Sequence, residues 1–172
     1  MIRRMSARRH LSAIVVLPGV VTVIVPAFIV LRTWAANVGW GLPASVRWLP
    51  LVLGVALLGL GLTLVIWTIR LFVVVGQGTL APWDPTTRIV VVGPYRHVRN
   101  PMISGVVCVL AGETALLGSR PLLYWLAAVV AVNAVYLPFV EEPGLRRRFG
   151  KEYDVYCANV PRWIPRLRPW SP

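Results

Sequence analysis

Long apolar runs, interrupted by short polar segments, divide the chain into four stretches. Residues 11–31 and 121–140 carry no charge, residues 49–75 carry a single arginine, and residues 102–117 carry a single glutamate. A helix of about 20 apolar residues crosses the hydrocarbon core of a bilayer. The alternating pattern of a barrel strand is absent, and backbone groups in lipid must be satisfied internally. The pattern therefore predicts an all-α integral membrane protein with four transmembrane helices.

Small residues indicate how these helices pack. Only Gly118, Ser119 and Arg120 separate the last two stretches, which predicts a tight C-terminal helical hairpin. Gly54 and Gly61 lie seven residues apart in the second stretch and share a helix face. Small residues at such positions permit close contact between helices, so we expect this face to pack against a neighbouring helix.

One acid and several aromatic residues stand out inside or beside the apolar stretches. Glu113 is expensive to place in a membrane and is therefore a functional candidate. It also lies five residues before Gly118, so it can reach the outer interface, and both interpretations stay open. Aromatic residues favour the membrane–water boundary, which predicts interface anchors at Trp34, Trp40, Trp48, Tyr124 and Trp125.

Composition excludes two broad classes. Hydrophobic residues make up 57% of the 172 residues and charged residues only 14%, whereas about a quarter of a soluble domain is charged and disordered chains are poor in apolar residues. The length suits one domain, residues 1–172. A formal charge of +12 would suggest nucleic acid in a soluble protein. In a chain this apolar it indicates an anionic membrane face, and no nucleic-acid partner is expected.

The basic residues predict the orientation in the membrane. Four spans place fifteen of them on one side and three on the other, and the positive-inside rule makes the richer side cytoplasmic. We therefore expect a multi-pass protein with both termini in the cytoplasm of a bacterial-type inner membrane, and a retained signal anchor at the start. The fifteen are Arg3, Arg4, Arg8, Arg9, Arg70, Arg88, Arg96, Arg99, Arg146, Arg147, Arg148, Lys151, Arg162, Arg166 and Arg168.

Polar side chains gather in two cytosolic segments, residues 93–105 and 141–165. The predicted hairpin brings both segments to the same membrane face. Arginine offers a planar fork of donors to a carboxylate or phosphate, while Glu141 or Glu142 would face an ammonium group or a ribose diol. S-adenosylmethionine needs both kinds of partner, and so does a nicotinamide dinucleotide. Cys108 and Cys157 have no metal-site or disulfide spacing, so no metal is expected.

The order of these motifs resembles a known family. The pattern Gly-x-Tyr-x-x-x-Arg-Asn-Pro-Met-x-x-Gly, an apolar span, Glu-Glu, Phe-Gly-x-x-Tyr-x-x-Tyr and Arg-x-Ile-Pro runs from Gly93 to Pro165. It is similar to the isoprenylcysteine carboxyl methyltransferases and to the related phospholipid N-methyltransferases. Asn100 and Ile103 stand where the prenylcysteine enzymes commonly have His and Tyr. The resemblance implies an integral membrane methyltransferase with a cytosolic S-adenosylmethionine pocket and a lipid-side tunnel for an apolar substrate.

The resemblance and the local chemistry together name candidate residues. Arg99, Glu142 and His97 are the catalytic candidates, with His97 or Glu142 able to take a proton from an amine acceptor. Arg162 is the candidate for contact with substrate. The candidates for binding the cofactor are Tyr95, His97, Arg99, Asn100, Pro101, Glu141, Glu142, Tyr153 and Tyr156.

Three functions remain open at this point. The first is methyl transfer from S-adenosylmethionine to a lipophilic acceptor, either a prenylcysteine-like carboxylate or a lipid amine. The second is an NADPH-dependent membrane reductase, because Tyr156-Cys157 and Val160-Pro161-Arg162 resemble the tail of the sterol reductases. The third is a non-enzymatic adaptor whose basic face binds anionic lipid. The partners expected are membrane lipids and a lipophilic or lipidated substrate, and the sequence does not give the oligomeric state.

Overall fold

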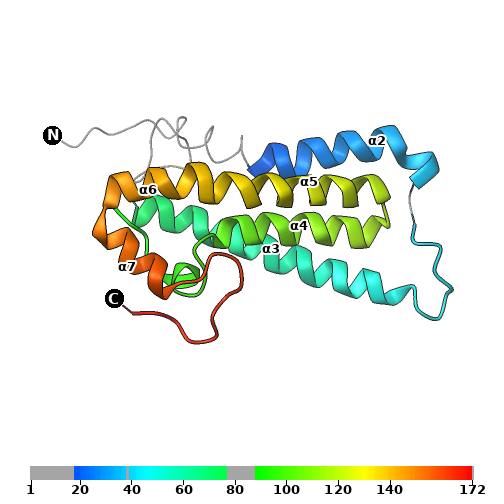
Figure 1. Ribbon diagram of the computed structural model, residues 1–172. Helices are drawn as coiled ribbons and strands as arrows, with labels where there is room; N and C mark the ends of the chain where they lie inside the picture. Colours follow the sequence, from blue (N-terminus) through cyan, green and yellow to red (C-terminus); the bar gives the residue numbers. More distant parts are fainter. Residues whose placement is uncertain (1–17, 38, 77–87, 172) are drawn as a thin grey trace.

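The computed structural model describes residues 18–37, 39–76 and 88–171. All regular elements in these ranges are helical (Figure 1). Two are π-helices, η1 and η3, and one, η2, is a 3₁₀-helix. In chain order the elements are η1 (Val20–Ile24), α2 (Val25–Asn37), α3 (Trp48–Val74), η2 (Gly93–Arg96), α4 (Pro101–Leu117), α5 (Arg120–Tyr136), η3 (Leu137–Glu141), α6 (Glu142–Phe149) and α7 (Lys151–Asn159).

The long helices lie side by side along one axis (Figure 1). Helix α4 packs between α3 and α5, and α2 lies along α5. Helices α5 and α6 are joined through η3 into one rod, and α7 then folds back beside η2. The short helices α6 and α7 and the C-terminal tail therefore gather at one end of the bundle, and the α4–α5 turn lies at the other.

Two helical rods are long and apolar enough to cross a membrane, Trp48–Val74 and Arg120–Phe149. The second is longer than the predicted span of residues 121–140, because η3 and α6 continue it without a break. The other apolar helices, Val20–Thr33 and Pro101–Leu117, are shorter. Residues 11–17 of the predicted first span, and the basic segment before it with Arg3, Arg4, Arg8 and Arg9, lie outside the described residues.

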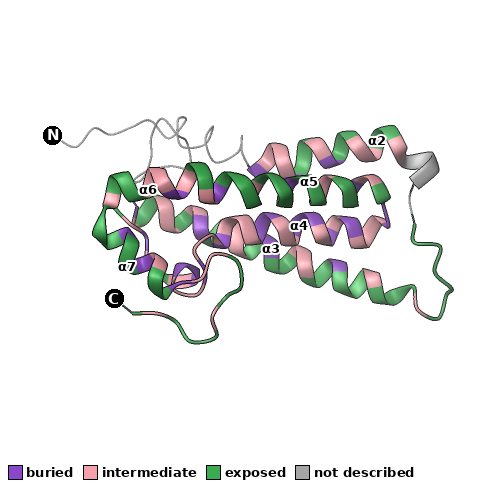
Figure 2. Ribbon diagram, in the orientation of Figure 1, coloured by how far each residue is buried: buried purple, intermediate pink, exposed green. Residues whose placement is uncertain are grey.

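Helix α4 can be shorter than a lipid-exposed span because protein surrounds it. None of its residues is exposed, whereas the outer faces of α3 and α5 are exposed and apolar (Figure 2). Val52, Leu60 and Val132 are among these outward side chains. Contiguous apolar surface of this extent on helices of spanning length is typical of contact with lipid.

Glycines set the distance between α3 and α4, as the spacing of Gly54 and Gly61 predicts. A Cβ atom on Gly61 would lie 2.7 Å from the carbonyl oxygen of Gly105, and one on Gly112 would lie 2.8 Å from that of Gly54. The two helices therefore touch backbone to backbone at two levels. Gly105, which belongs to the family-like motif, has this packing role.

The predicted hairpin between α4 and α5 is confirmed. Gly118 ends α4 in the left-handed conformation, with φ of +60°, where L side chains are strained. Ser119 then begins α5, and its hydroxyl accepts a hydrogen bond from the backbone N–H of Leu122, a common N-cap. A Cβ on Gly118 would also collide with the backbone of Gly39, whose N–H donates to the carbonyl of Leu117.

The aromatic residues divide into two groups. Trp48 and Tyr124 are exposed, as interface anchors are, and Trp40 donates from its indole to the carbonyl of Ala115. Trp125 also packs against another helix, because its indole Nε1 donates to the carbonyl of Val21 in η1, at 3.0 Å. Pro26 lacks the N–H that a π-helix would offer to this carbonyl, so Trp125 satisfies it instead. The side chain of Trp34 lies outside the described residues.

The contact between α3 and α4 yields a prediction about stability. Gly61→Ala should lower the free energy of unfolding by about 1–3 kcal/mol, because the added methyl group collides with backbone atoms that cannot move aside. The measurement is denaturant unfolding in mixed micelles. Gly59→Ala is the matched control: it lies on the same helix with open space around a built Cβ. That variant should be neutral or slightly more stable, and equal losses for both would contradict the packing argument.

Candidate functional site

The polar end of the bundle is organised around η2 and the start of α4. Gly93 has a positive φ and lies close to the ring of Trp67 on α3. The ring of Tyr95 is buried and lies 5.6 Å from that of Phe72. The carbonyl of Tyr95 accepts a hydrogen bond from the hydroxyl of Tyr156, at 2.8 Å. Helix α7 is thereby fixed over η2, and both are held against α3.

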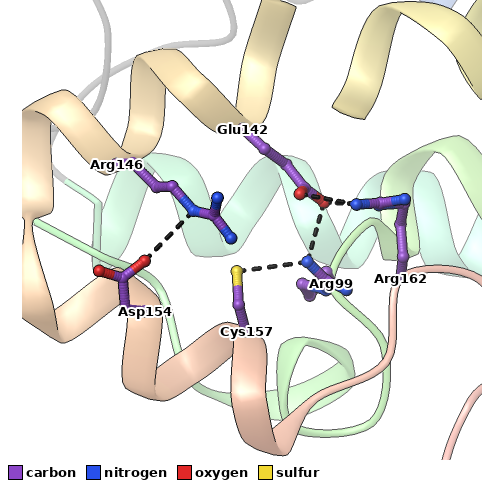
Figure 3. Close-up of polar contacts among 6 residues, drawn as sticks. All are labelled: Arg99, Glu142, Arg146, Asp154, Cys157 and Arg162. Atoms are coloured by element: carbon purple, nitrogen blue, oxygen red, sulfur yellow. Dashed lines mark hydrogen bonds and ion pairs between the residues drawn. The ribbon is translucent and has the colours of Figure 1, made fainter. Parts of the chain in front are cut away.

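A buried carboxylate joins three segments beside η2 (Figure 3). Glu142, whose side chain is 6% exposed, accepts from Nη1 of Arg99 at 2.9 Å. It also accepts from Nε and Nη2 of Arg162, at 2.7 and 2.8 Å. Nη1 of Arg99 lies 3.2 Å from the sulfur of Cys157 on α7. This ion-pair cluster connects the start of α6, the entry to α4 and the C-terminal tail.

The C-terminal tail runs along the segment between η2 and α4. The backbone N–H of Arg99 donates to the carbonyl of Pro161, and that of Arg166 donates to the carbonyl of His97. Nδ1 of His97 lies 2.8 Å from the carbonyl of Arg166. Arg96 bonds the carbonyl of Trp170 and the hydroxyl of Ser171. The tail is therefore part of the site's framework.

A cavity of about 610 Å³ lies beside the ion-pair cluster. Its volume is in the range of a small-molecule site. One end is apolar and is formed by side chains of η1, α4 and α5, including Val21, Val106 and Val129. The other end is polar and is formed by the entry to α4, by α6 and by α7. The cavity thus connects the apolar interior of the bundle with its polar end.

The structure brings six of the sequence-predicted residues to the cavity wall. They come from four segments and supply a cation, an amide, a carboxylate and three phenols: Tyr95, Arg99, Asn100, Glu141, Tyr153 and Tyr156. Four others lie outside the lining. His97 is bonded to the tail, Glu142 and Arg162 pair with each other, and Pro101 is buried at the first turn of α4. Neighbouring helical residues point about 100° apart. Glu141 therefore faces the cavity while Glu142 points toward Arg99 and Arg162.

The charges at the polar end are held in defined states. The hydrogen bond to Glu142 raises the pKa of the Arg162 guanidinium above its ordinary value, so it stays protonated. Burial raises the pKa of the Tyr153 and Tyr156 hydroxyls, and burial followed by the charges of Tyr156 and Glu141 raises that of Tyr95. All three phenols remain neutral hydrogen-bonding groups at physiological pH.

An unsatisfied donor remains in this arrangement. Nε of Arg99 is buried and has no hydrogen-bond partner among the described residues. Buried donors are nearly always paired. Because Arg99 also lines the cavity, its guanidinium has hydrogen-bonding capacity left for a further group. Glu113 also has an unpaired buried oxygen within the described part of the chain, but it is absent from the lining of the cavity.

Sequence reasoning missed several wall residues on the long C-terminal rod. Asn133, Tyr136, Gly144 and Arg148 face the cavity along one side of α5 and α6. They recur at intervals of three, eight and four residues, which are spacings found along one broad face of a helix. Glu141 falls on the same face. The sequence could have indicated this face if the last helix had been predicted to continue past residue 140.

This molecule is a helical membrane protein with a cavity that runs from apolar side chains of η1, α4 and α5 to the polar end of the bundle. The family model described as phospholipid methyltransferase matches residues 49–152, well over half of the chain. The chain therefore belongs to the phospholipid methyltransferase family, which confirms the related group suggested by its motifs. No curated protein and no solved structure matches it.

A buried ion pair at Glu142 and an exposed one at Asp154 allow a prediction with an internal control. Glu142→Ala should lower the free energy of unfolding by about 3 kcal/mol, because it leaves the largely buried Arg99 without its counter-charge. Asp154→Ala breaks the pair between Asp154 and Arg146, whose side chains are 61% and 55% exposed, and should cost less than about 1 kcal/mol. Thermal and denaturant unfolding in detergent measure both. Equal effects would show that Glu142 is not a framework residue.

Proposed function

We propose that this protein transfers a methyl group from S-adenosylmethionine to a lipophilic acceptor. The family supports a membrane methyltransferase acting on a lipid-related substrate. The observation that carries the proposal is the cavity itself, which is apolar inside the bundle and polar at the end where Arg99, Glu141 and the tyrosines meet. A cofactor at the polar end and an acyl or prenyl chain at the apolar end would share one continuous cavity.

The residues at the polar end fit S-adenosylmethionine. Its carboxylate would meet Arg99, which has an unmatched Nε–H, and Arg148. Its ammonium or ribose hydroxyls would meet Glu141, and its adenine would lie among the rings of Tyr95, Tyr153 and Tyr156, with Asn100 supplying an amide. The Glu142 pairs hold Arg99 in place, so Glu142 and Arg162 act here as supports of the cofactor site.

The main contribution of the protein to this reaction is to position the two reactants. S-adenosylmethionine supplies a sulfonium methyl group that is already activated. The protein must hold the acceptor atom in line with it, roughly 3 Å away, and keep water out. A carboxylate acceptor is ionised near neutral pH. An amine acceptor must lose a proton, and Glu141 is the carboxylate that the described residues place at the cavity wall.

The proposal includes the position of the site relative to the membrane. We infer one domain that crosses a bacterial-type inner membrane four times, with both termini and the polar end of the cavity in the cytoplasm. The distribution of arginines supports this orientation, as do the alternating directions of α2, α3, α4 and α5 (Figure 1). The apolar end of the cavity then lies at the depth of the lipid chains.

Ligand titration tests the cofactor. S-adenosylmethionine and S-adenosylhomocysteine should raise the melting temperature of the detergent-solubilised protein as their concentration rises above the dissociation constant. Arg99→Lys keeps a cation beside Glu142 but removes the Nε–H, and Glu141→Gln removes the cavity carboxylate. Each should weaken binding about tenfold or more, the cost of one charged hydrogen bond.

Arg147→Ala is the control for this titration, because Arg147 is exposed and outside the cavity lining. Its affinity should match that of the unaltered protein. A shift with NADPH alone would replace the proposal by a reductase, and no shift with any of the three ligands would favour a lipid-binding adaptor.

The apolar end of the cavity gives a separate prediction for the acceptor. Val132 lies on α5 and lines the cavity, whereas Val130, on the same helix, is outside the lining. Val132 is 65% exposed, so the cavity opens beside it on the outer face of α5. Val132→Trp should obstruct that opening to an apolar chain and lower kcat/KM for a lipophilic acceptor at least about tenfold, without changing affinity for S-adenosylmethionine. Val130→Trp should leave both unchanged. Methyl transfer to extracted membrane lipids in nanodiscs measures the effect, and equal rates in the two variants would contradict it.

A further inference from the structure

The C-terminal tail presents apolar side chains outward although it is tied to the bundle. The side chains of Ile164 and Leu167 are 80% and 97% exposed, and Trp163 is also exposed. Pro161, Pro165 and Pro169 flank them, so this stretch has no helix to fold them inward. Three large apolar side chains on one short loop would expose an unusual amount of apolar surface to water.

The position of this loop is set by hydrogen bonds to the start of a membrane helix. Arg166 bonds through its backbone N–H to the carbonyl of His97, at 3.0 Å, and α4 begins at Pro101. The ring of Trp170 lies 6.0 Å from that of Tyr156. The loop therefore lies at the level where α4 enters the bundle, and Figure 1 shows it curving back beside the long helices. In the topology proposed above, that level is the boundary between lipid and water.

The charge of the loop is of one sign. No acidic residue follows Asp154 in the chain, whereas Arg166 and Arg168 alternate with the apolar side chains. Arg162 differs, because it is paired with Glu142, and Arg166 donates from its side chain to the carbonyl of Asn159. Arg168 is exposed. Apolar and aromatic residues interleaved with arginine are the composition of segments that lie in an anionic membrane interface.

We propose that residues 163–168 form a membrane contact that inserts Trp163, Ile164 and Leu167 among lipid chains and places Arg168 against anionic lipid headgroups. The partner is the bilayer that the protein itself crosses. Because the same tail carries Arg162 and bonds His97 and Arg99, this contact holds the framework of the cavity against the membrane surface. The contact does not depend on which reaction the cavity performs.

Fluorescence quenching in nanodiscs tests the contact. Leu167→Cys is made in a chain with Cys108→Ser and Cys157→Ser and is labelled with an environment-sensitive fluorophore. The lipids carry a nitroxide just below the headgroup. The label should be quenched and its emission should shift to the blue, more strongly with anionic phosphatidylglycerol present than with phosphatidylcholine alone. Adding Arg168→Gln should reduce this preference by about fivefold, the effect of one arginine near an anionic surface.

Glu152→Cys, exposed in the first turn of α7, is the matched labelling site and should be neither shifted nor quenched. Equal quenching at both sites, or quenching at residue 167 that ignores lipid charge, would overturn the proposal. A blue shift without quenching would also overturn it, since that result indicates contact with another protein copy. The labelled chains should retain the melting temperature of the parent, which excludes a misfolded tail as the cause.

Discussion

A single buried carboxylate holds together the polar end of this molecule. Glu142 accepts hydrogen bonds from Arg99 at the entry to α4 and from Arg162 in the C-terminal tail. A buried charge is tolerated only when it is paired and hydrogen-bonded. The three segments therefore stay together or separate together. The cavity owes its polar wall to this arrangement, because the same contact fixes the guanidinium of Arg99.

The close packing of α3 and α4 positions Arg99, the partner of Glu142 at the entry to α4. The contacts of Gly61 with Gly105 and of Gly54 with Gly112 bring two backbones together, which the driving forces for helix association in lipid favour. Helix α4 is then enclosed between α3 and α5, with Arg99 two residues before its first turn. The volume that the large side chains of α5 leave beside α4 becomes the cavity.

The two ends of the cavity explain how one small protein can serve a lipid-related reaction. Charged and phenolic groups suit a soluble cofactor, and valine and tryptophan side chains suit a chain drawn from the bilayer. The tail adds a third element, because its arginines and apolar residues lie beside the start of α4. The polar end of the cavity, its apolar end and the tail all depend on the contacts among the entry to α4, the start of α6 and the C-terminal tail.

The sequence by itself determined the helical membrane class, the hairpin at Gly118, the glycine face of α3 and the family, because each depends on local spacing and composition. It also named Tyr95, Arg99, Asn100 and Glu141, which lie in or beside short motifs and which line the cavity. Only the tertiary structure decided that Glu142 turns away to pair with Arg162, that His97 bonds the tail, and that Trp125 supports η1. Those outcomes depend on which side of a helix meets a distant segment, and pairing across 20 or more residues leaves no signal in a single sequence.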